Sequence, residues 1–427
     1  MRYLRSDPTI ESPSTVMAEE VGSAMRYLRS DPTRAGERRL TRRDLLGRVA
    51  VGGAAATFLA ACGAGKEESR ATTPGAGAAG RAAATAAPPT VAATLPEWEE
   101  ALAAARREGK VVVNTFTGEA YRRILRHFSQ AYPDIKLEHT NLEPVDFVPR
   151  ITQERNANLY TWDVVLFPTS TAFQVLKPAG VWNPVRPAII LPELKDDKVW
   201  RDGFEAGFLD KDRELCYGYT LVRGGGVYIN TDQVKDEEVK SFTDLLNPKW
   251  KGKIAVSDPR TIGSTFWPLT VARLKHGDGI MKPFLIDQEP VLSRDRNQLT
   301  EFVIRGRYPI GVGLNDQAVK DFQRQGVGKN IRRIFLDDLQ YQSSGAIWLV
   351  NKAPHPNAAK VFINWFLSKD AQTIAAKELE TNSRRLDVEP GDANLLVPMG
   401  VKLLQIDAEE ILPEVVKTQD ISKQLIR

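Results

Sequence analysis

From residue 96 onwards, predicted helices and strands alternate along the chain. Residues 96–109 carry apolar side chains at helical spacing and end at a glycine, and the β-branched run 110–116 follows directly. The pattern continues with a helix, a strand, a helix and a strand at 119–133, 135–141, 145–157 and 162–167. Parallel strands need a crossover that is usually a helix, so this alternation predicts an α/β fold with a mostly parallel sheet covered on both faces.

The same order of elements restarts near Gly218. Strands are predicted within 219–230, 253–258 and 309–314, and a helix follows each of the last two. The remaining elements are a strand at 344–351, two helices around 357–378 and an apolar-periodic tail at 395–427. A chain of 427 residues can bury two cores of this size. We therefore expect two α/β sheets of comparable size.

The first 62 residues have the features of an export leader. Arg42 and Arg43 precede an apolar run of 13 residues, 49–61, that ends at Cys62. As a helix this run would rise about 20 Å, short of the roughly 30 Å hydrocarbon core of a bilayer. The arginine pair resembles a twin-arginine signal, and Leu-Ala-Ala-Cys resembles a lipobox whose cysteine is lipidated after cleavage. We expect export and lipidation at Cys62; the alternative is a chance arginine pair before a buried helix.

Two further features belong to this leader and to the segment after it. MRYLRSDPT occurs at 1–9 and again at 25–33, which indicates a duplicated leader or a start assigned too early, so Met1, Met17 and Met25 all stay open as the start. Residues 63–95 consist mostly of Gly, Ala, Thr and Pro. Such a composition buries too little apolar surface to offset its ordering entropy, so we expect a disordered tether.

Charge and cysteine content exclude other classes of protein. The formal net charge is +4, of which residues 1–62 contribute +3, so the rest of the chain is nearly neutral and nucleic-acid binding is not expected. The two cysteines are far apart, and the four histidines are scattered. This spacing does not fit a zinc site. We expect neither a cofactor nor a metal held by the protein itself.

Four segments resemble the family 1 extracellular solute-binding proteins of ABC importers, and are most similar to the ferric-ion-binding branch. These segments are 110–138, 162–182, 242–259 and 346–376. The branch also includes relatives that take phosphonates, sugar phosphates, thiamine or polyamines. The resemblance implies a periplasmic-binding-protein type II fold, with two mostly parallel sheets in two lobes, crossing hinge strands and a cleft between the lobes. It also implies a monomer that works with a permease and an ATPase.

By this analogy the chain divides into two discontinuous lobes. Lobe 1 is expected to comprise 97–222 and 331–380, and lobe 2 to comprise 223–330 and 381–427. Ligand binding between the lobes would then shift an equilibrium between open and closed forms, and the permease would recognise the closed form.

The candidate ligand-binding residues follow the carboxyl ends of the predicted strands. In open α/β sheets ligands bind beyond the carboxyl ends of the strands, where helix N-termini favour anions. The candidates are Thr115, Thr117, Gly118, Thr169, Ser170, Thr171, Arg260, Thr261, Ser264, Thr265, Asn315 and Asp316. Hydroxyl, amide and guanidinium groups suit carboxylate, phosphate or phosphonate oxygens. Ordinary helix capping is the alternative for each residue taken alone.

Two arginines join this set for other reasons. Arg223 lies beside Gly224, Gly225 and Gly226 near the expected crossing strands, where three glycines fit a hinge, a backbone that faces the ligand or a simple bulge. Arg384 falls where the related proteins return to the cleft, although an arginine next to another arginine is usually solvated.

The expected ligand is an anion rather than bare ferric ion. Iron-loading members of the family carry adjacent tyrosines after the strand that matches 309–314, whereas this chain has Leu314, Asn315, Asp316 and Gln317 there. The remaining candidate ligands are therefore a phosphonate, a sugar phosphate, an organic acid and a chelated ferric ion.

Two other classes of function stay open at this point. An enzyme on the same fold could use Cys216 as a nucleophile, but only with a base nearby in space, and the sequence contains no recognisable catalytic motif. Burial of Cys216 among apolar side chains would argue against an enzyme. A sensor that displays the same domain on a tether is the other alternative.

Overall fold

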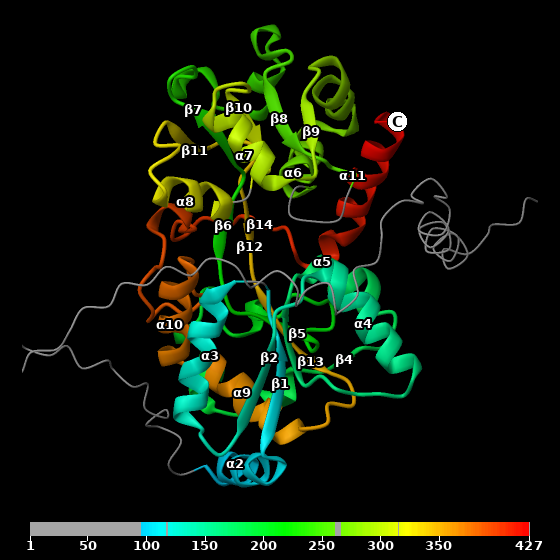
Figure 1. Cartoon of the computed structure of the whole chain (residues 1–427), viewed down its shortest axis with the longest axis vertical. Helices are drawn as coiled ribbons and strands as arrows, with labels where there is room; N and C mark the ends of the chain where they lie inside the picture. Colours follow the sequence, from blue (N-terminus) through cyan, green and yellow to red (C-terminus); the bar gives the residue numbers. More distant parts are fainter. Residues whose placement is uncertain (1–94, 117, 261–265, 315, 427) are drawn as a thin grey trace, which may run out of the picture. The chain divides into compact units, whose positions relative to one another are not determined.

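The computed structural model describes residues 95–116, 118–260, 266–314 and 316–426 (Figure 1). The predicted leader, the lipidation site Cys62 and most of the predicted tether lie outside the described residues. Within the part that is described, none of the helices has the length and apolar character needed to span a bilayer.

The first sheet is mixed and has the order β2-β1-β3-β13-β4, with β5 also paired to β13. Strand β1 runs parallel to β2 and β3, and β13 runs antiparallel to β3, β4 and β5. The strands are β1 (Lys110–Asn114), β2 (Lys136–Thr140), β3 (Val164–Phe167), β4 (Trp182–Asn183), β5 (Cys216–Gly218) and β13 (Ala346–Val350). The expected parallel strands are thus present, and returning strands complete the sheet.

Helices cover both faces of this sheet. They are α2 (Pro96–Glu108), α3 (Glu119–Ala131), α4 (Pro144–Asn156), α9 (Pro356–Leu367) and α10 (Lys369–Leu379). Helix α2 begins with a proline and ends at Gly109, whose left-handed conformation is the one expected at a helix C-terminus. On one face Phe128 packs against Phe362 and Trp365, and on the other Phe147 packs against Trp162. The helix expected after β3 is a short α5 (Thr169–Thr171) followed by a π turn.

The second sheet has the order β11-β7-β10-β8-β9. Strand β8 is parallel to β10 and β9, while β7 is antiparallel to β10 and β11. Its strands are β7 (Gly226–Asn230), β8 (Ile254–Ser257), β9 (Val291–Ser293), β10 (Ile310–Val312) and β11 (Ile331–Phe335). The helices of this half are α6 (Phe266–His276), α7 (Arg296–Ile304), α8 (Asp316–Arg324) and α11 (Leu412–Leu425).

A third, small sheet lies where the chain crosses between these two halves (Figure 1). It consists of β14 (Leu404–Gln405), β12 (Tyr341–Ser343) and β6 (Val222–Gly224). Strand β6 leads through Gly225 directly into β7, and β11 and β13 flank β12 along the chain. These are the crossing strands that the resemblance implies, and they join the two lobes.

The structure assigns two segments differently from the expected division into lobes. Strand β11 pairs with β7, so residues 331–335 belong to the sheet of lobe 2. Residues 382–386 bond to the first half of the chain instead, because Leu221 N–H donates to Asn382 O and Arg384 N–H donates to Tyr219 O. Pairing between distant strands decides both assignments, and sequence order does not reveal it.

Candidate ligand-binding site

A cavity of about 290 Å³ lies beside the crossing strands. Strands β6, β7, β11 and β12 and the starts of α6 and α8 contribute its walls. The described residues that line it include Arg223, Gly224, Gly226, Tyr228, Trp267, Asp316, Arg333, Tyr341 and Leu395. Because the cavity lies between the hinge and lobe 2, a ligand here contacts the elements whose relative positions change when lobes open and close.

Two of the three adjacent glycines make room for cavity side chains. A Cβ atom at Gly226 would lie 2.2 Å from Arg333 Nε and 2.8 Å from its Cγ. A Cβ atom at Gly224 would lie 2.0 Å from the ring of Tyr341. Gly225 has a φ of 88°, and its Cβ would lie 2.1 Å from Leu339 O. The triplet therefore allows Arg333 and Tyr341 to lie against the backbone, so close approach explains it.

Arg333 shares a carboxylate with a tyrosine. Its Nη1 donates to Asp316 Oδ2 at 2.7 Å, and the hydroxyl of Tyr228 donates to the other oxygen of Asp316. Burial alone would lower the pKa of Arg333, but the charge of Asp316, the neighbouring Tyr228 and Tyr341 and the hydrogen bond to Asp316 together outweigh burial and raise it. Arg333 Nε is buried and has no hydrogen-bond partner. One donor of a guanidinium at the cavity is thus left for another acceptor.

Arg223 lies close to Arg333 and has no carboxylate partner among the described residues. Its Nε donates to Gln340 Oε1 at 3.1 Å, and its guanidinium carbon lies 4.1 Å from the ring centroid of Phe335. The guanidinium of Arg333 lies over the same ring at 4.9 Å. Burial and then the charge of Arg333 lower the pKa of Arg223. Of these two neighbouring cations only Arg333 is paired with a carboxylate, which leaves an excess of positive charge at this wall of the cavity.

The structure brings two of the predicted site residues together at this cavity, Arg223 and Asp316. The predicted residues of lobe 1 lie elsewhere. The Thr115 hydroxyl is buried, donates to Phe116 O and lies 2.8 Å from His139 Nε2. Gly118 precedes α3 with a φ of 130°.

Thr169, Ser170 and Thr171 form α5, and the buried hydroxyl of Thr169 has no hydrogen-bond partner. Like Thr115 and Gly118, these three residues do not line the cavity. Placement therefore gives no support to their predicted contact with a ligand.

Two predicted arginines are engaged within the protein. Arg260 forms a bidentate ion pair with Asp258, in which Nε donates to Oδ1 and Nη2 donates to Oδ2, each at 2.9 Å. Burial alone would raise the pKa of Asp258, but hydrogen bonds from Arg260 and Arg294 outweigh it and lower the pKa to about 2.

Arg384 is 98% buried, and its terminal nitrogens donate to the carbonyls of Ala206 and Arg201. Neither Arg260 nor Arg384 lines this cavity, although Arg384 lines a second one of about 250 Å³. The other predicted ligand residues, Thr117, Thr261, Ser264, Thr265 and Asn315, lie outside the described residues.

Sequence reasoning missed Arg333, Tyr228 and Tyr341. Arg333 lies in the middle of β11, opposite Tyr228, so the rule that selects strand ends could not find it. The glycine triplet was the available signal, because glycines in a strand mark close approach of another group. The sequence does not say which side chain approaches.

Cys216 is fully buried within the apolar cluster that includes Phe173 and Trp348. Burial raises the pKa of its thiol, and the charge of Asp210 raises it further. A buried protonated thiol is a poor nucleophile, so the alternative of a Cys216 enzyme gains no support.

The model for bacterial extracellular solute-binding proteins matches residues 123–384, which is more than half of the chain. The chain belongs to the bacterial extracellular solute-binding proteins. Its fold is the two-lobed one of the periplasmic binding proteins. Proteins of this family bind small ligands outside the cytoplasm and are transport receptors rather than enzymes.

Two curated relatives of this solute-binding protein cover only part of it. An uncharacterised protein of Haemophilus influenzae is 27% identical over 161 residues, which are 36% of this chain and 45% of the relative. Iron uptake protein A1 of Synechocystis is 23% identical over 216 residues, which are 46% of this chain and 55% of the relative. The chain thus spans about half the length of the curated relatives it matches.

Solved structures agree with the fold over a longer part of the chain. A Trichodesmium protein in complex with iron and citrate has a TM-score of 0.60 at 18% identity, over 74% of this chain and 99% of the other. The periplasmic binding protein AfuA of Actinobacillus pleuropneumoniae, with fructose-6-phosphate bound, has a TM-score of 0.54 at 20% identity. That match covers 74% of this chain and 96% of the other. At these identities the likeness shows the fold alone.

Proposed function

We propose that this solute-binding protein is the receptor of an ABC importer and that it captures a small anionic solute between Arg223 and Arg333. The observation that carries the proposal is that two neighbouring guanidinium groups line a cavity of about 290 Å³ and only one of them is paired with a carboxylate. Buried charges are ordinarily paired, and an anionic ligand would supply the missing negative charge.

The donors are arranged to receive oxygen atoms. Neither terminal nitrogen of Arg223 donates to a described residue, and Arg333 Nε is buried without a partner. A carboxylate, a phosphate or a phosphonate can accept hydrogen bonds from both arginines at once. The hydroxyls of Tyr228 and Tyr341 add polar groups that can contact the rest of the solute.

Direct capture of bare ferric ion fits these residues poorly. Burial raises the pKa of both Tyr228 and Tyr341, which disfavours the phenolate forms that bind ferric ion. The two arginines add positive charge, which opposes a bare cation. An anion, or ferric ion carried by an anionic chelator, is compatible with the same cavity. The sugar phosphate of the AfuA structure is an example of an anion, and the Trichodesmium structure combines iron with citrate, an anionic chelator.

Thermal unfolding with a panel of solutes tests the proposal. The panel contains phosphonates, sugar phosphates, dicarboxylates, ferric citrate, thiamine and polyamines, each added to the full chain. A ligand that binds only the folded state raises the melting temperature. We expect at least one anion to raise it, and a variant with both Arg223→Gln and Arg333→Gln to lose that response. A response to polyamines alone would overturn the proposal.

The anchor and the transport partners form a second part of the proposal. The leader motifs predict that Cys62 is lipidated and holds the receptor at the outer face of the cell membrane. We expect the wild-type chain in the membrane fraction and Cys62→Ala in the soluble fraction. Recovery of a permease and an ATPase with the cross-linked receptor would support transport, whereas recovery of a sensor kinase alone would favour the sensor.

A further inference from the structure

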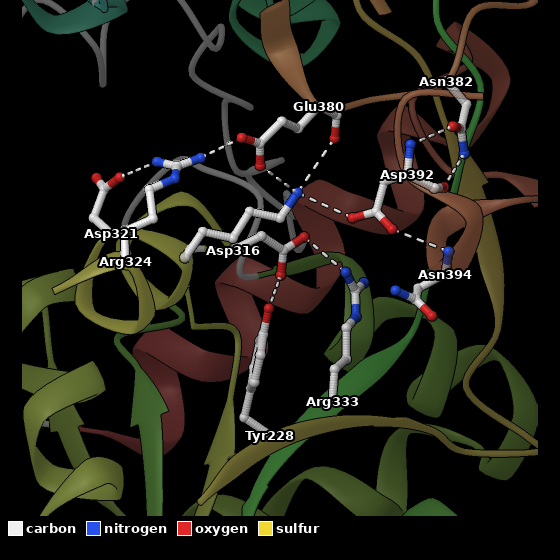
Figure 2. A network of polar contacts seen from close by, with 10 residues as sticks. Tyr228, Asp316, Asp321, Arg324, Arg333, Glu380, Asn382, Asp392 and Asn394 are labelled. Carbon is white, nitrogen blue, oxygen red and sulfur yellow. Dashed lines mark hydrogen bonds and ion pairs between the residues drawn. The ribbon is translucent and has the colours of Figure 1, made fainter. Parts of the chain in front are cut away.

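Helix α8 carries charged groups at both of its ends, and the two ends contact different parts of the molecule. Its first residue, Asp316, bonds to Arg333 in the cavity. One turn later Lys320 begins a second polar network, and Arg324 at the last position continues it (Figure 2). The helix belongs to lobe 2, where Val319 packs with Tyr228 and Ile331.

The partners of Lys320 and Arg324 belong to lobe 1. Lys320 Nζ donates to Asp392 Oδ2 at 3.0 Å and to Glu380 O at 3.3 Å, and it lies 3.4 Å from Glu380 Oε2 (Figure 2). Arg324 bonds to the other carboxylate oxygen of Glu380. Glu380 caps α10, and α10 packs against α3. These ion pairs therefore join the lobes in addition to the covalent crossing strands.

Lobe 1 holds these acceptors firmly. Glu380 adopts a left-handed φ of 48° after α10, and Thr381 N–H donates to Ala376 O. Asn382 and Asp392 exchange two hydrogen bonds, at 2.9 and 3.0 Å, that close the loop between them (Figure 2). Asp392 also accepts from the Asn394 N–H. A closed loop with a fixed carboxylate presents a preformed partner for Lys320.

This network also lies at the rim of the cavity. Leu395, three residues after Asp392, lines the cavity, and the short helix Ala393–Leu395 contacts β6. The side chain of Lys320 is 26% exposed and that of Asp392 is 15% exposed. Ion pairs that are partly shielded from water are screened less by salt than fully exposed ones.

We propose that Lys320 and Arg324 form a latch that holds lobe 2 against the 380–392 loop of lobe 1. The latch favours the closed arrangement of the lobes and so slows the release of a solute from the cavity. The statement about release rests on the proposed function, whereas the statement about closure does not. Each pair of this kind contributes a modest free energy, so loss of both should change the ratio of closed to open molecules about fivefold.

Distance measurements on the ligand-free protein test the closure directly. Spin labels at Lys253→Cys in lobe 2 and Lys377→Cys in lobe 1 report the separation of the lobes, in a full chain that carries Cys62→Ser. Both lysines are exposed, and the native Cys216 is buried and stays unlabelled. Double electron–electron resonance should show a larger population of long distances between the two spin labels when Lys320→Met and Arg324→Met are combined. Lys320→Arg should keep the wild-type distribution.

A matched variant and a second measurement separate the possible outcomes. Lys329→Met removes an exposed lysine just beyond α8 and should leave the distances unchanged, and urea unfolding checks that each variant is folded. Unchanged distances in the folded double variant would overturn the latch. For the anion found in the solute panel, stopped-flow dissociation should be about fivefold faster in the double variant. If no anion binds but the distances change, the proposed function fails and the latch stands.

Discussion

Arg333 and Arg384 are both largely buried arginines, but their partners differ. Arg333 lies at the cavity with an 18% exposed side chain, and its partner is the carboxylate of Asp316. Arg384 lies inside lobe 1, and its terminal nitrogens donate to the carbonyls of Ala206 and Arg201. Burial lowers the pKa of Arg384, whereas the charge of Asp316 raises that of Arg333.

This difference separates a structural arginine from one that can exchange partners. The carbonyl partners of Arg384 belong to the fold and cannot leave without unfolding a loop. An anionic solute can approach Arg333 where it lines the cavity, and its neighbour Arg223 lacks a carboxylate partner among the described residues. The identity of the acceptor therefore tells more about function than burial of the arginine does.

The largest effect is expected for the structural arginine. Arg384→Met removes the donors of two buried carbonyls, which should lower the free energy of unfolding by roughly 3 kcal/mol. Urea unfolding of the full chain measures it, and Arg333→Met serves as the matched control, with a loss of less than about 1 kcal/mol. Equal losses of unfolding free energy in the two variants would show that Arg333 is as important to the fold as Arg384.

A second prediction concerns Asp407, which faces the same region as Arg384. Burial raises the pKa of Asp407 to about 6, although Ser344 N and Gln405 Nε2 donate to it at 2.7 and 2.5 Å. A carboxyl group with a raised pKa in the folded state costs stability when it ionises. The wild type should therefore lose on the order of 2 kcal/mol as the pH rises from about 4 to 6.

Urea unfolding at several pH values checks this effect. Asp407→Asn cannot ionise, so its unfolding free energy should be flatter over the same pH range. A parallel pH profile for the two proteins would contradict the raised pKa of Asp407.

A smaller effect is expected from the backbone beside Arg333. Gly226→Ala places a Cβ atom on the path of the Arg333 side chain, without the strain of a positive φ, so Arg333 has to move away from Asp316. Affinity for the anionic solute should fall about tenfold, as measured by calorimetry. Gly279→Ala is the matched control, because no atom lies within 4 Å of the added Cβ. Unchanged affinity in Gly226→Ala would mean that the position of Arg333 does not matter.

The sequence predicted the α/β fold well, because alternation of helix and strand follows from local spacing. Helix α3 lies within the predicted range 119–133, and Gly109 ends α2 as predicted. Only some of the residues that line the cavity were among the predicted site residues. Asp316 follows a strand and Arg223 lies beside three glycines, so local rules could find both. Arg333 reaches the cavity because β11 pairs with β7 across about a hundred residues, and no local pattern sets that register.

The same limit explains the placement of Arg384 and Arg260. An arginine beside another arginine reads as a solvated or ligand-facing pair, but tertiary packing buries Arg384 in lobe 1. Arg260 follows a strand as the rule requires, yet Asp258, two residues before it, satisfies its guanidinium. Both oxygens of Asp258 bond to Arg260 outside the cavity, whereas Asp316 accepts from a single nitrogen of Arg333 at the cavity wall.

The central claim is that Arg333, rather than Arg260, holds the anionic solute. Calorimetric titration of the full chain with the anion found in the solute panel tests it most directly, with wild type, Arg333→Gln and Arg260→Gln side by side. We predict that Arg333→Gln weakens binding by about tenfold or more and that Arg260→Gln stays within about twofold of wild type. Wild-type affinity in Arg333→Gln, or loss of binding in Arg260→Gln, would contradict the claim.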